Sequence, residues 1–225
     1  MITVADCQRV QTAWFRYRAT GLGGAIWEDG PLTWTDGPDG LNLMFPPALT
    51  DATLLRGLIR AGDRPIGAWL NLDVDPAPLL RAGFERGWSP WWMAADLTGF
   101  PTGDPRVRLQ TSSTDYEGEH AAYADQLAIT RLRPQRAWYA AAYDQGRFAG
   151  RAWSFVGDDG LAGIFDMAVW PPFRRRGLGT ALLKAVSVAS GAHRAILNAT
   201  PEGKLLYERC GFRPVGEGIT YWRHR

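Results

Sequence analysis

Residues 169–180 read Val-Trp-Pro-Pro-Phe-Arg-Arg-Arg-Gly-Leu-Gly-Thr, and this segment constrains the fold more than any other part of the chain. It joins a β-rich run, Leu161–Val169, to an apolar run of helical character that starts at Thr180. Glycine lets a backbone pass close to a ligand because it has no Cβ. The free N–H groups of a first helical turn, together with the helix dipole, favour a bound phosphate. The segment therefore predicts a strand, a glycine-rich loop and a helix that hold a diphosphate, with arginines at the rim.

The loop by itself also fits a tight turn with solvated arginines. It lacks the Gly-Lys-Ser/Thr ending of a nucleoside triphosphate loop, and Leu182 stands where a dinucleotide fingerprint has its third glycine. The choice between ligand binding and a plain turn therefore depends on the residues C-terminal to the loop.

A strand and a second helix are predicted beyond the helix that the loop opens. Residues 195–198 (Ala-Ile-Leu-Asn) favour a short strand, and residues 201–210 favour a helix that begins with a proline and stops before Gly211-Phe212. The joint order of strand, Arg-x-x-Gly-x-Gly loop, helix, strand with Asn198, helix with Tyr207 and Gly211-Phe212 resembles the GNAT superfamily of N-acetyltransferases. The resemblance covers roughly residues 145–225.

The first half of the chain carries a weaker copy of this order. Three pairs recur at nearly constant spacing: Pro47 and Pro172, Asn71 and Asn198, Phe84 and Phe212. We therefore interpret the chain as two copies of one unit, residues 1–100 and 101–225, joined by the Gly- and Pro-rich segment 98–105. Because residues 48–51 (Ala-Leu-Thr-Asp) replace the arginine–glycine loop, the first copy is expected to be degenerate and non-catalytic, similar to the N-terminal halves of tandem GNAT proteins.

The resemblance implies an α/β (α+β) fold class with two GNAT-like domains, each a mixed, mostly antiparallel twisted sheet flanked by helices. Recurrent Ala, Tyr and Leu predict helices over Asp115–Ile129 and Pro134–Tyr143, which would wall an acceptor groove. Strands are predicted over Arg147–Val156 and Leu161–Val169, joined by a turn at residues 157–160.

The resemblance also implies a site for acetyl-CoA as co-substrate, with no metal. A backbone N–H near Ala168 or Val169 would polarise the thioester, and Asn198 would contact the pantetheine or an ordered water, or else cap the next helix. The residues expected to bind the diphosphate are Arg174, Arg175, Arg176, Gly177, Leu178, Gly179 and Thr180, and those expected along the pantetheine are Met167, Ala168 and Val169.

Two residues are the candidate catalytic groups. Tyr207 matches the family tyrosine that protonates the leaving thiolate, and a phenol with a pKa near about 10 is protonated before the reaction. The alternative for Tyr207 is core packing. Asp166 is the candidate base, directly or through water, and its alternative is a structural carboxylate. Glu119 and His120 are further candidates, and a water chain also serves as a base in this family.

Composition bounds the other functions. The net charge is +2, so a nucleic-acid site at Arg174–Arg176 is disfavoured, and no apolar run reaches membrane-spanning length. Two cysteines are too few for a disulfide framework or metal cluster, and the start of the sequence lacks a signal pattern, which predicts a cytoplasmic protein. The predominance of arginine over lysine indicates a GC-rich bacterial genome. The expected function is an N-acetyltransferase acting on a small-molecule or peptide amine, as a monomer or homodimer; the rival is a non-catalytic acyl-CoA binder.

Overall fold

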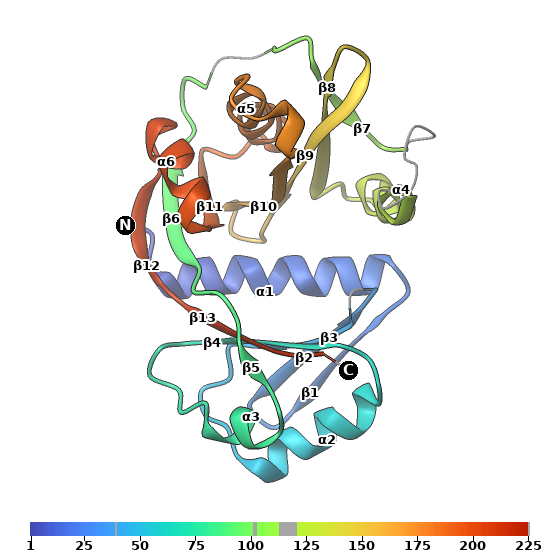
Figure 1. Ribbon diagram of the computed structural model, residues 1–225, viewed down its shortest axis with the longest axis vertical. Helices are drawn as coiled ribbons and strands as arrows, with labels where there is room; N and C mark the ends of the chain where they lie inside the picture. The colour runs from blue at the N-terminus through green and yellow to red at the C-terminus, as the bar shows by residue number, and fades with distance from the viewer. Residues whose placement is uncertain (39, 101–102, 113–120, 225) are drawn as a thin grey trace.

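The computed structural model describes residues 1–38, 40–100, 103–112 and 121–224, and these residues form two β-sheets with a long helix between them (Figure 1). The first sheet has the strand order β1-β2-β3-β4-β13-β5. Its strands are β1 (Ala25–Asp29), β2 (Leu32–Gly37), β3 (Gly40–Met44), β4 (Ile66–Leu70), β5 (Glu85–Arg86) and β13 (Ile219–Arg223). Strands β3 and β4 run parallel, whereas the other described pairs are antiparallel.

The second sheet has the strand order β12-β6-β11-β10-β9-β8-β7. Its strands are β6 (Trp91–Asp96), β7 (Val107–Gln110), β8 (Ala137–Asp144), β9 (Arg147–Val156), β10 (Ala162–Val169), β11 (Arg194–Ala199) and β12 (Arg213–Glu217). Here β10 and β11 form the parallel pair. Both sheets are thus mixed and mostly antiparallel, as the sequence predicts.

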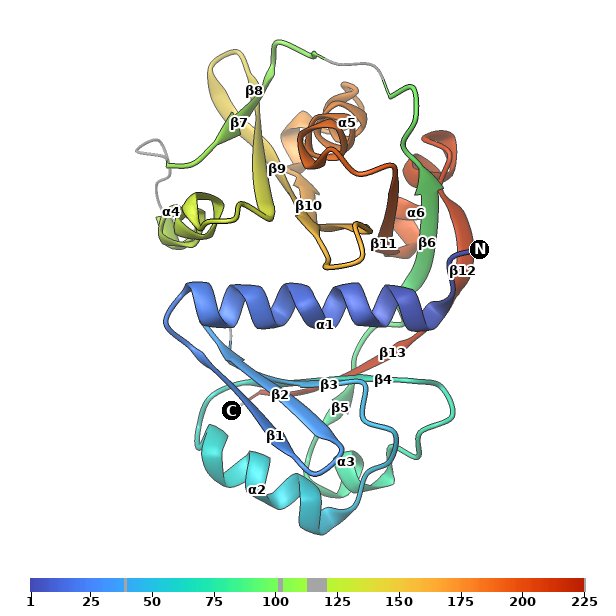
Figure 2. The ribbon, with the colours of Figure 1, turned by 180° about the vertical axis from the view of Figure 1, so that it is seen from behind.

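The long helix α1 (Val4–Gly21) lies between the two sheets, as Figures 1 and 2 show from opposite sides. It begins with a capping box in which the Asp6 N–H donates to the Thr3 hydroxyl at 3.3 Å and the Thr3 N–H donates to the Asp6 carboxylate at 2.8 Å. Trp14, from its buried face, stacks on Phe165 of β10 with ring centroids 5.1 Å apart. Phe15 of the same helix meets Trp69 of β4 with ring centroids 5.7 Å apart, so one helix contacts both sheets.

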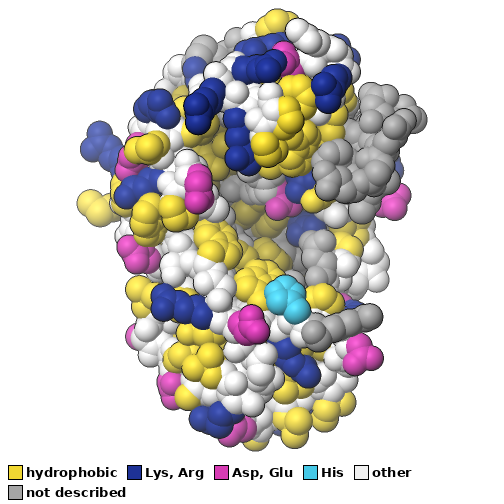
Figure 3. Space-filling view, viewed as in Figure 1, with side chains coloured by type: hydrophobic (Ala, Val, Ile, Leu, Met, Phe, Trp, Pro, Cys, Tyr) yellow, Lys and Arg dark blue, Asp and Glu magenta, His cyan; other side chains and the backbone are white. Residues whose placement is uncertain are grey.

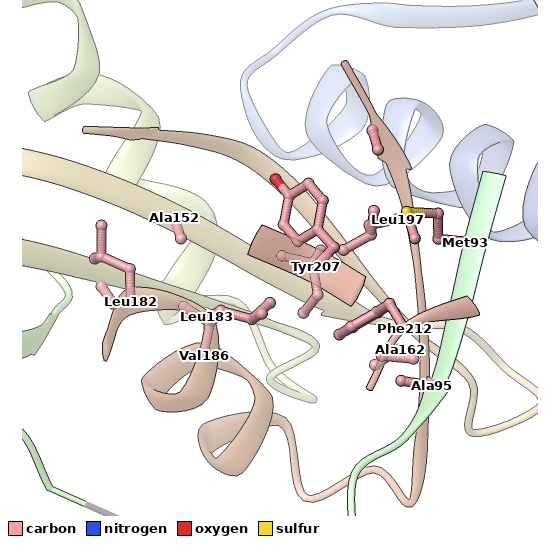
Figure 4. Close-up of a cluster of buried hydrophobic side chains, with 14 of the residues drawn as sticks. Met93, Ala95, Ala152, Ala162, Leu182, Leu183, Val186, Leu197, Tyr207 and Phe212 are labelled. Carbon is pink, nitrogen blue, oxygen red and sulfur yellow. The ribbon is translucent and has the colours of Figure 1, made fainter. Parts of the chain in front are cut away.

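The other helices cover the faces of the sheets that point away from α1 or flank the second sheet. The helices beside the first sheet are α2 (Asp51–Ala61) and α3 (Ala77–Arg81), and those beside the second are α4 (Ala121–Gln126), α5 (Leu178–Ser190), α6 (Pro201–Arg209) and the short 3-10 helices η2 (Leu127–Arg131) and η3 (Pro171–Phe173). Figure 4 shows the core beneath α5, where Leu182, Leu183 and Val186 meet side chains of the second sheet and Phe212. None of the helices in the described residues combines the length and apolar character that a membrane crossing requires.

The last strand of each half of the chain lies in the sheet of the other half. Strand β6 runs between β11 and β12 of the second sheet, with Ala95 opposite Ala195. Strand β13 runs between β4 and β5 of the first sheet, with Tyr221 opposite Ala68. Each sheet therefore contains strands from both sides of residue 100. The division of the chain into two folding units at that residue stays a prediction.

The sequence-based helix over Pro134–Tyr143 is wrong, because most of this segment is strand β8. Alanine favours helices intrinsically, but β8 is buried on both faces. Ala140 and Ala142 contact the cluster under α5, whereas Tyr139 and Ala141 contact the cluster under α1. Small side chains here let α5 pack close to the sheet, so tertiary packing overrides local propensity. Of the predicted helix over 115–129, the described part forms α4 and η2.

Candidate functional site

A groove of about 1320 Å³ opens on the second sheet, between β10 and the starts of α5 and α6. It is hollowed below a group of Lys and Arg side chains in the upper half of the view in Figure 3. Of the residues that the sequence predicts for the site, those that line it are Asp166, Met167, Ala168, Val169, Arg174, Arg175, Gly177, Leu178, Gly179, Thr180, Asn198 and Tyr207. The fold therefore brings residues from four separate elements to one groove.

The groove exists because β10 and β11 separate. They pair from Ala162 opposite Ala195 to Ile164 opposite Leu197, and no further. On its other side β10 has a register shift between Phe165 and Ala168, the mark of a β-bulge. Asp166 takes a positive φ of 49° inside this bulge. The end of β10 is thereby bent away from β11 and leaves a strand edge along the groove.

The glycine-rich loop turns into α5 at the end of this edge. Gly177 has a φ of 79° and is the N-cap of α5, a left-handed conformation that favours glycine. The first N–H groups of α5 have no partner within the helix and face this end of the groove. Gly179 serves a different contact, because an added Cβ there would lie 2.7 Å from Leu206 Cδ1 of α6.

The three arginines of the loop have different surroundings. Arg174 Nε donates to the Val169 carbonyl at 3.0 Å and stays on the groove. Arg175 lines the groove with a backbone φ of 61°. Arg176 instead forms an ion pair with Asp144 of β8 and donates to the Pro172 carbonyl at 3.1 Å, so its side chain braces the loop rather than lining the groove. A direct contact of the Arg176 side chain with a diphosphate stays a prediction without support from this geometry.

Arg106 is a residue of this region that sequence reasoning missed. Its Nη1 donates to the Arg176 carbonyl at 3.0 Å, and its Nη2 pairs with Asp104 at 2.7 Å. With Thr180 and Lys184 it lines a second hollow of about 760 Å³ on the other side of Gly177. No local motif marks Arg106, because it reaches the loop only through the fold.

Tyr207 lies in the wall of the groove with its ring in the core. Its side chain is 8% exposed, and its ring meets Phe212 at 6.1 Å in an edge-to-face arrangement. In Figure 4 the phenol oxygen lies on the side away from Phe212 and Val186. Burial raises the pKa of Tyr207 to about 12. The phenol is therefore protonated throughout the neutral range.

Asn198 lines the groove and is also tied to α1. Its Nδ2 donates to Gln11 Oε1 at 3.0 Å. The capping alternative for Asn198 is wrong, because Thr200 caps α6 and its hydroxyl accepts from the Gly203 N–H at 3.2 Å. Directly after β4 of the first sheet, the corresponding Asn71 accepts a hydrogen bond from Gln8. Helix α1 thus orients an asparagine on each side.

Asp166 is an exposed carboxylate in the bulge, on the lining of the groove. The other candidate bases, Glu119 and His120, lie outside the described residues. Among the described residues there is no cluster of three or more His, Cys, Asp or Glu side chains that could hold a metal ion.

Residues 134–214 match a family model described as an acetyltransferase (GNAT) domain. The match runs from just before β8 to the start of β12, so it contains the bulge, the loop and Tyr207. This part of the chain is therefore similar to GNAT acetyltransferase domains. No curated protein matches the chain in sequence.

Solved structures resemble the whole chain. A putative GNAT-family acetyltransferase from Novosphingobium aromaticivorans has a TM-score of 0.61 at 21% identity, covering 93% of this chain and 96% of that chain. A GCN5-related N-acetyltransferase from Kribbella flavida has a TM-score of 0.60 at 16% identity, covering 94% of each. A tandem GNAT protein from the clavulanic acid biosynthesis pathway has a TM-score of 0.53 at 17% identity, covering 99% of this chain and 96% of that chain. At these identities the likeness shows a shared fold.

Proposed function

We propose that the chain transfers an acetyl group from acetyl-CoA directly to an amine. One observation carries the proposal: the strand edge opened by the bulge at Asp166 leads without interruption to the N-terminus of α5, with the Tyr207 phenol in the wall between them. A thioester joined by a long arm to a diphosphate has the same linear order of groups.

The groove suits that co-substrate at both ends. The first N–H groups of α5 and the Arg174 and Arg175 side chains would hold the diphosphate. The strand edge at Met167–Val169 would pair with the amides of the pantetheine arm, and Asn198 would add a contact from β11. The thioester supplies an activated acetyl group. An N–H of Ala168 or Val169 aimed at its oxygen would contribute roughly 2.7–4 kcal/mol of polarisation, as one donor does in other acyl-transfer sites.

Two side chains would manage the protons. As the amine nitrogen bonds to the acetyl carbon and the carbon–sulfur bond breaks, the Tyr207 hydroxyl would donate its proton to the sulfur. Asp166, directly or through water, would accept the proton that the nitrogen loses. Because the pKa of Tyr207 is raised to about 12, the donor keeps its proton until it is needed.

The first sheet is proposed to be the degenerate copy of a tandem arrangement. The order of a parallel strand pair with its two helices recurs as β3-α2-β4-α3 and β10-α5-β11-α6. The likeness of the whole chain to a protein described as a tandem GNAT supports this. The glycine-rich loop is present only in the second half.

Incubation of the purified protein with acetyl-CoA and a library of amines tests the proposal. We expect free thiol to appear only when a suitable amine is present, together with an amine product heavier by one acetyl group in the mass spectrum. Binding of acetyl-CoA without transfer to any amine would favour the non-catalytic acyl-CoA binder. Absence of binding would overturn both.

A further inference from the structure

A buried arginine that has no polar partner among the described residues lies on β9, one strand away from the bulge. Arg151 is 8% exposed, and its Nε and Nη1 are buried without a hydrogen-bond partner. No acidic side chain of the described residues forms an ion pair with it. An uncompensated buried charge is strongly unfavourable, so the fold maintains this guanidinium at a cost.

The described contacts of the Arg151 guanidinium are aromatic. Its Cζ lies 3.4 Å from the centre of the Tyr123 ring of α4 and 5.6 Å from that of Trp170. Cation–π stacking is weaker than the interactions with water that a buried charge loses, so it offsets only part of the desolvation. The two rings hold the guanidinium in place and leave its Nε and Nη1 donors unused.

Arg136, which directly precedes β8 of the same sheet, shows what a structural arginine looks like. It stacks on Phe155 with Cζ 4.9 Å from the ring centre, but its Nε donates to the Val156 carbonyl at 2.9 Å and its Nη1 pairs with Asp158 at 2.7 Å. The Arg151 guanidinium also stacks on aromatic rings, but its Nε and Nη1 have no hydrogen-bond partner. The described residues therefore give the Arg151 guanidinium no anionic partner, and a bound anion would supply one.

The location of Arg151 relates that anion to the groove. Arg151 is the cross-strand partner of Ala168, and neighbouring strands lie about 4.8 Å apart. Ala168 and Trp170 both line the groove. An anion on Arg151 would thus be held one strand away from the position proposed for the acetyl group.

We propose that Arg151 binds the carboxylate of the acceptor, and that the acceptor is an amino acid with an apolar side chain. This inference rests on the proposed function and names its substrate class. A single guanidinium in aromatic surroundings balances a monoanion, whereas a doubly charged phosphate would leave a buried negative charge. The planar fork of arginine matches a carboxylate with two hydrogen bonds, and Tyr123 and Trp170 offer the apolar side chain a surface. Arg151 is then a specificity-determining residue.

Paired acceptors test this in the full chain. Phenylalanine, leucine and methionine are compared with their primary amides, using kcat/KM for acetyl transfer. We expect the wild-type protein to prefer each acid, and Arg151→Met to reduce kcat/KM for the acids by about 30-fold or more while changing that for the amides little. Comparing the acid-to-amide ratio between variants cancels the different basicities of the two amines.

A binding measurement accompanies the kinetics, with N-acetylphenylalanine and its amide as probes in calorimetry. The acid should bind the wild-type protein and lose affinity in Arg151→Met. The melting temperature of Arg151→Met should stay equal or rise, because an unpaired charge is replaced by an apolar chain. Arg136→Met is the matched control: it should lower the melting temperature and leave the acid-to-amide ratio unchanged.

The outcomes separate the two claims. Transfer to amides or other neutral amines with no preference for acids, failure of the acid probe to bind, or the same acid preference in Arg151→Met would each overturn the role of Arg151 and leave the acetyltransferase intact. A marked loss of stability in Arg151→Met with unchanged selectivity would make Arg151 structural. Failure to bind acetyl-CoA at all would overturn the proposed function itself.

Discussion

The two parallel strand pairs of this protein share their order and differ in how they end. In the first sheet, β3 and β4 stay paired to the end of β3, and the Phe45 N–H then adds a hydrogen bond to the Trp69 carbonyl at 2.8 Å. In the second sheet, pairing stops at Ile164, yet β10 continues to Val169 over a bulge. We call the pair β3 and β4 closed, because it stays paired to its end, and the pair β10 and β11 open, because the end of β10 is unpaired on that side.

The difference shows that a glycine-rich loop is only half of such a site. Pro46-Pro47 comes directly after Phe45 in the first half, and the Phe45 ring packs near Trp69 and Trp92. In the second half, residues 165–170 intervene between the paired segment and the prolines. These extra residues form the free strand edge, so the first sheet would lack a place for an extended ligand even with the loop grafted onto it.

The largest expected effect comes from a substitution in the glycine-rich loop that follows the open pair. Gly177→Val places a β-branched residue at a φ of 79° and should abolish the amide cradle. Loss of the charge-assisted hydrogen bonds that the cradle would donate should weaken acetyl-CoA binding by about 100-fold or more, measured by calorimetry. The fold should survive, because an added Cβ has only Arg106 Nη2 nearby, at 3.8 Å.

Gly191→Val is the matched control for that variant. Gly191 caps the other end of α5 with a φ of 65° and open space around it. It should show a similar loss of stability with unchanged binding. Equal affinity for acetyl-CoA in Gly177→Val and Gly191→Val would show that the loop is a plain turn.

The next effect concerns the proton donor. Tyr207→Phe keeps the ring against Phe212 and removes only the hydroxyl, so affinity for acetyl-CoA should hold while turnover falls by about 10²–10⁴. Steady-state kinetics with an identified acceptor, under conditions where chemistry limits the rate, provide the measurement. Tyr221→Phe, a buried tyrosine of the first sheet, serves as the control and should turn over normally. Wild-type turnover in Tyr207→Phe would assign Tyr207 to packing.

A smaller effect is expected at the bulge. Asp166→Asn keeps a residue that tolerates positive φ and removes the carboxylate, so the open strand should persist and turnover should fall by about 10²-fold. The measurement is kcat across pH, compared with acetyl-CoA affinity. If kcat is unchanged while binding is intact, Asp166 shapes the bulge and water accepts the proton.

The smallest effect is on stability at alkaline pH. The pKa of Tyr207 is about 12 in the fold against an ordinary value of 10.0, because burial disfavours the phenolate. Above pH 10 the unfolded chain loses this proton first, so the free energy of unfolding declines between pH 10 and 12 by up to about 2 kcal/mol. Denaturant titrations should show a shallower decline in Tyr207→Phe; parallel curves would contradict burial of the hydroxyl.

Sequence patterns predict the elements near the loop well. The strand ending at Val169, the helix after the loop and the helix starting at Pro201 are confirmed within two residues. These signals are local, since glycine, proline and the apolar period mark each end. The helix proposed over 134–143 failed because the alanines of β8 pack against α5, which is distant in sequence.

Other features depend on contacts that no local pattern records. The exchange of β6 and β13 between the sheets results from pairing across the whole chain. Arg176 looks like a ligand in sequence but pairs with Asp144. Arg106 and Arg151 carry no motif, and only the fold brings Arg106 to the loop and Arg151 to the strand beside the bulge. The partner of a charged side chain is set by the residues that lie near it in space, and sequence spacing does not reveal those residues.

Calorimetric titration of the intact chain with acetyl-CoA tests the contrast between the closed and open strand pairs most directly. The open pair alone should bind, which predicts one acetyl-CoA per chain and binding that is weaker by about 100-fold or more after Gly177→Val. Two sites per chain, or one site that survives Gly177→Val with unchanged affinity, would contradict the account.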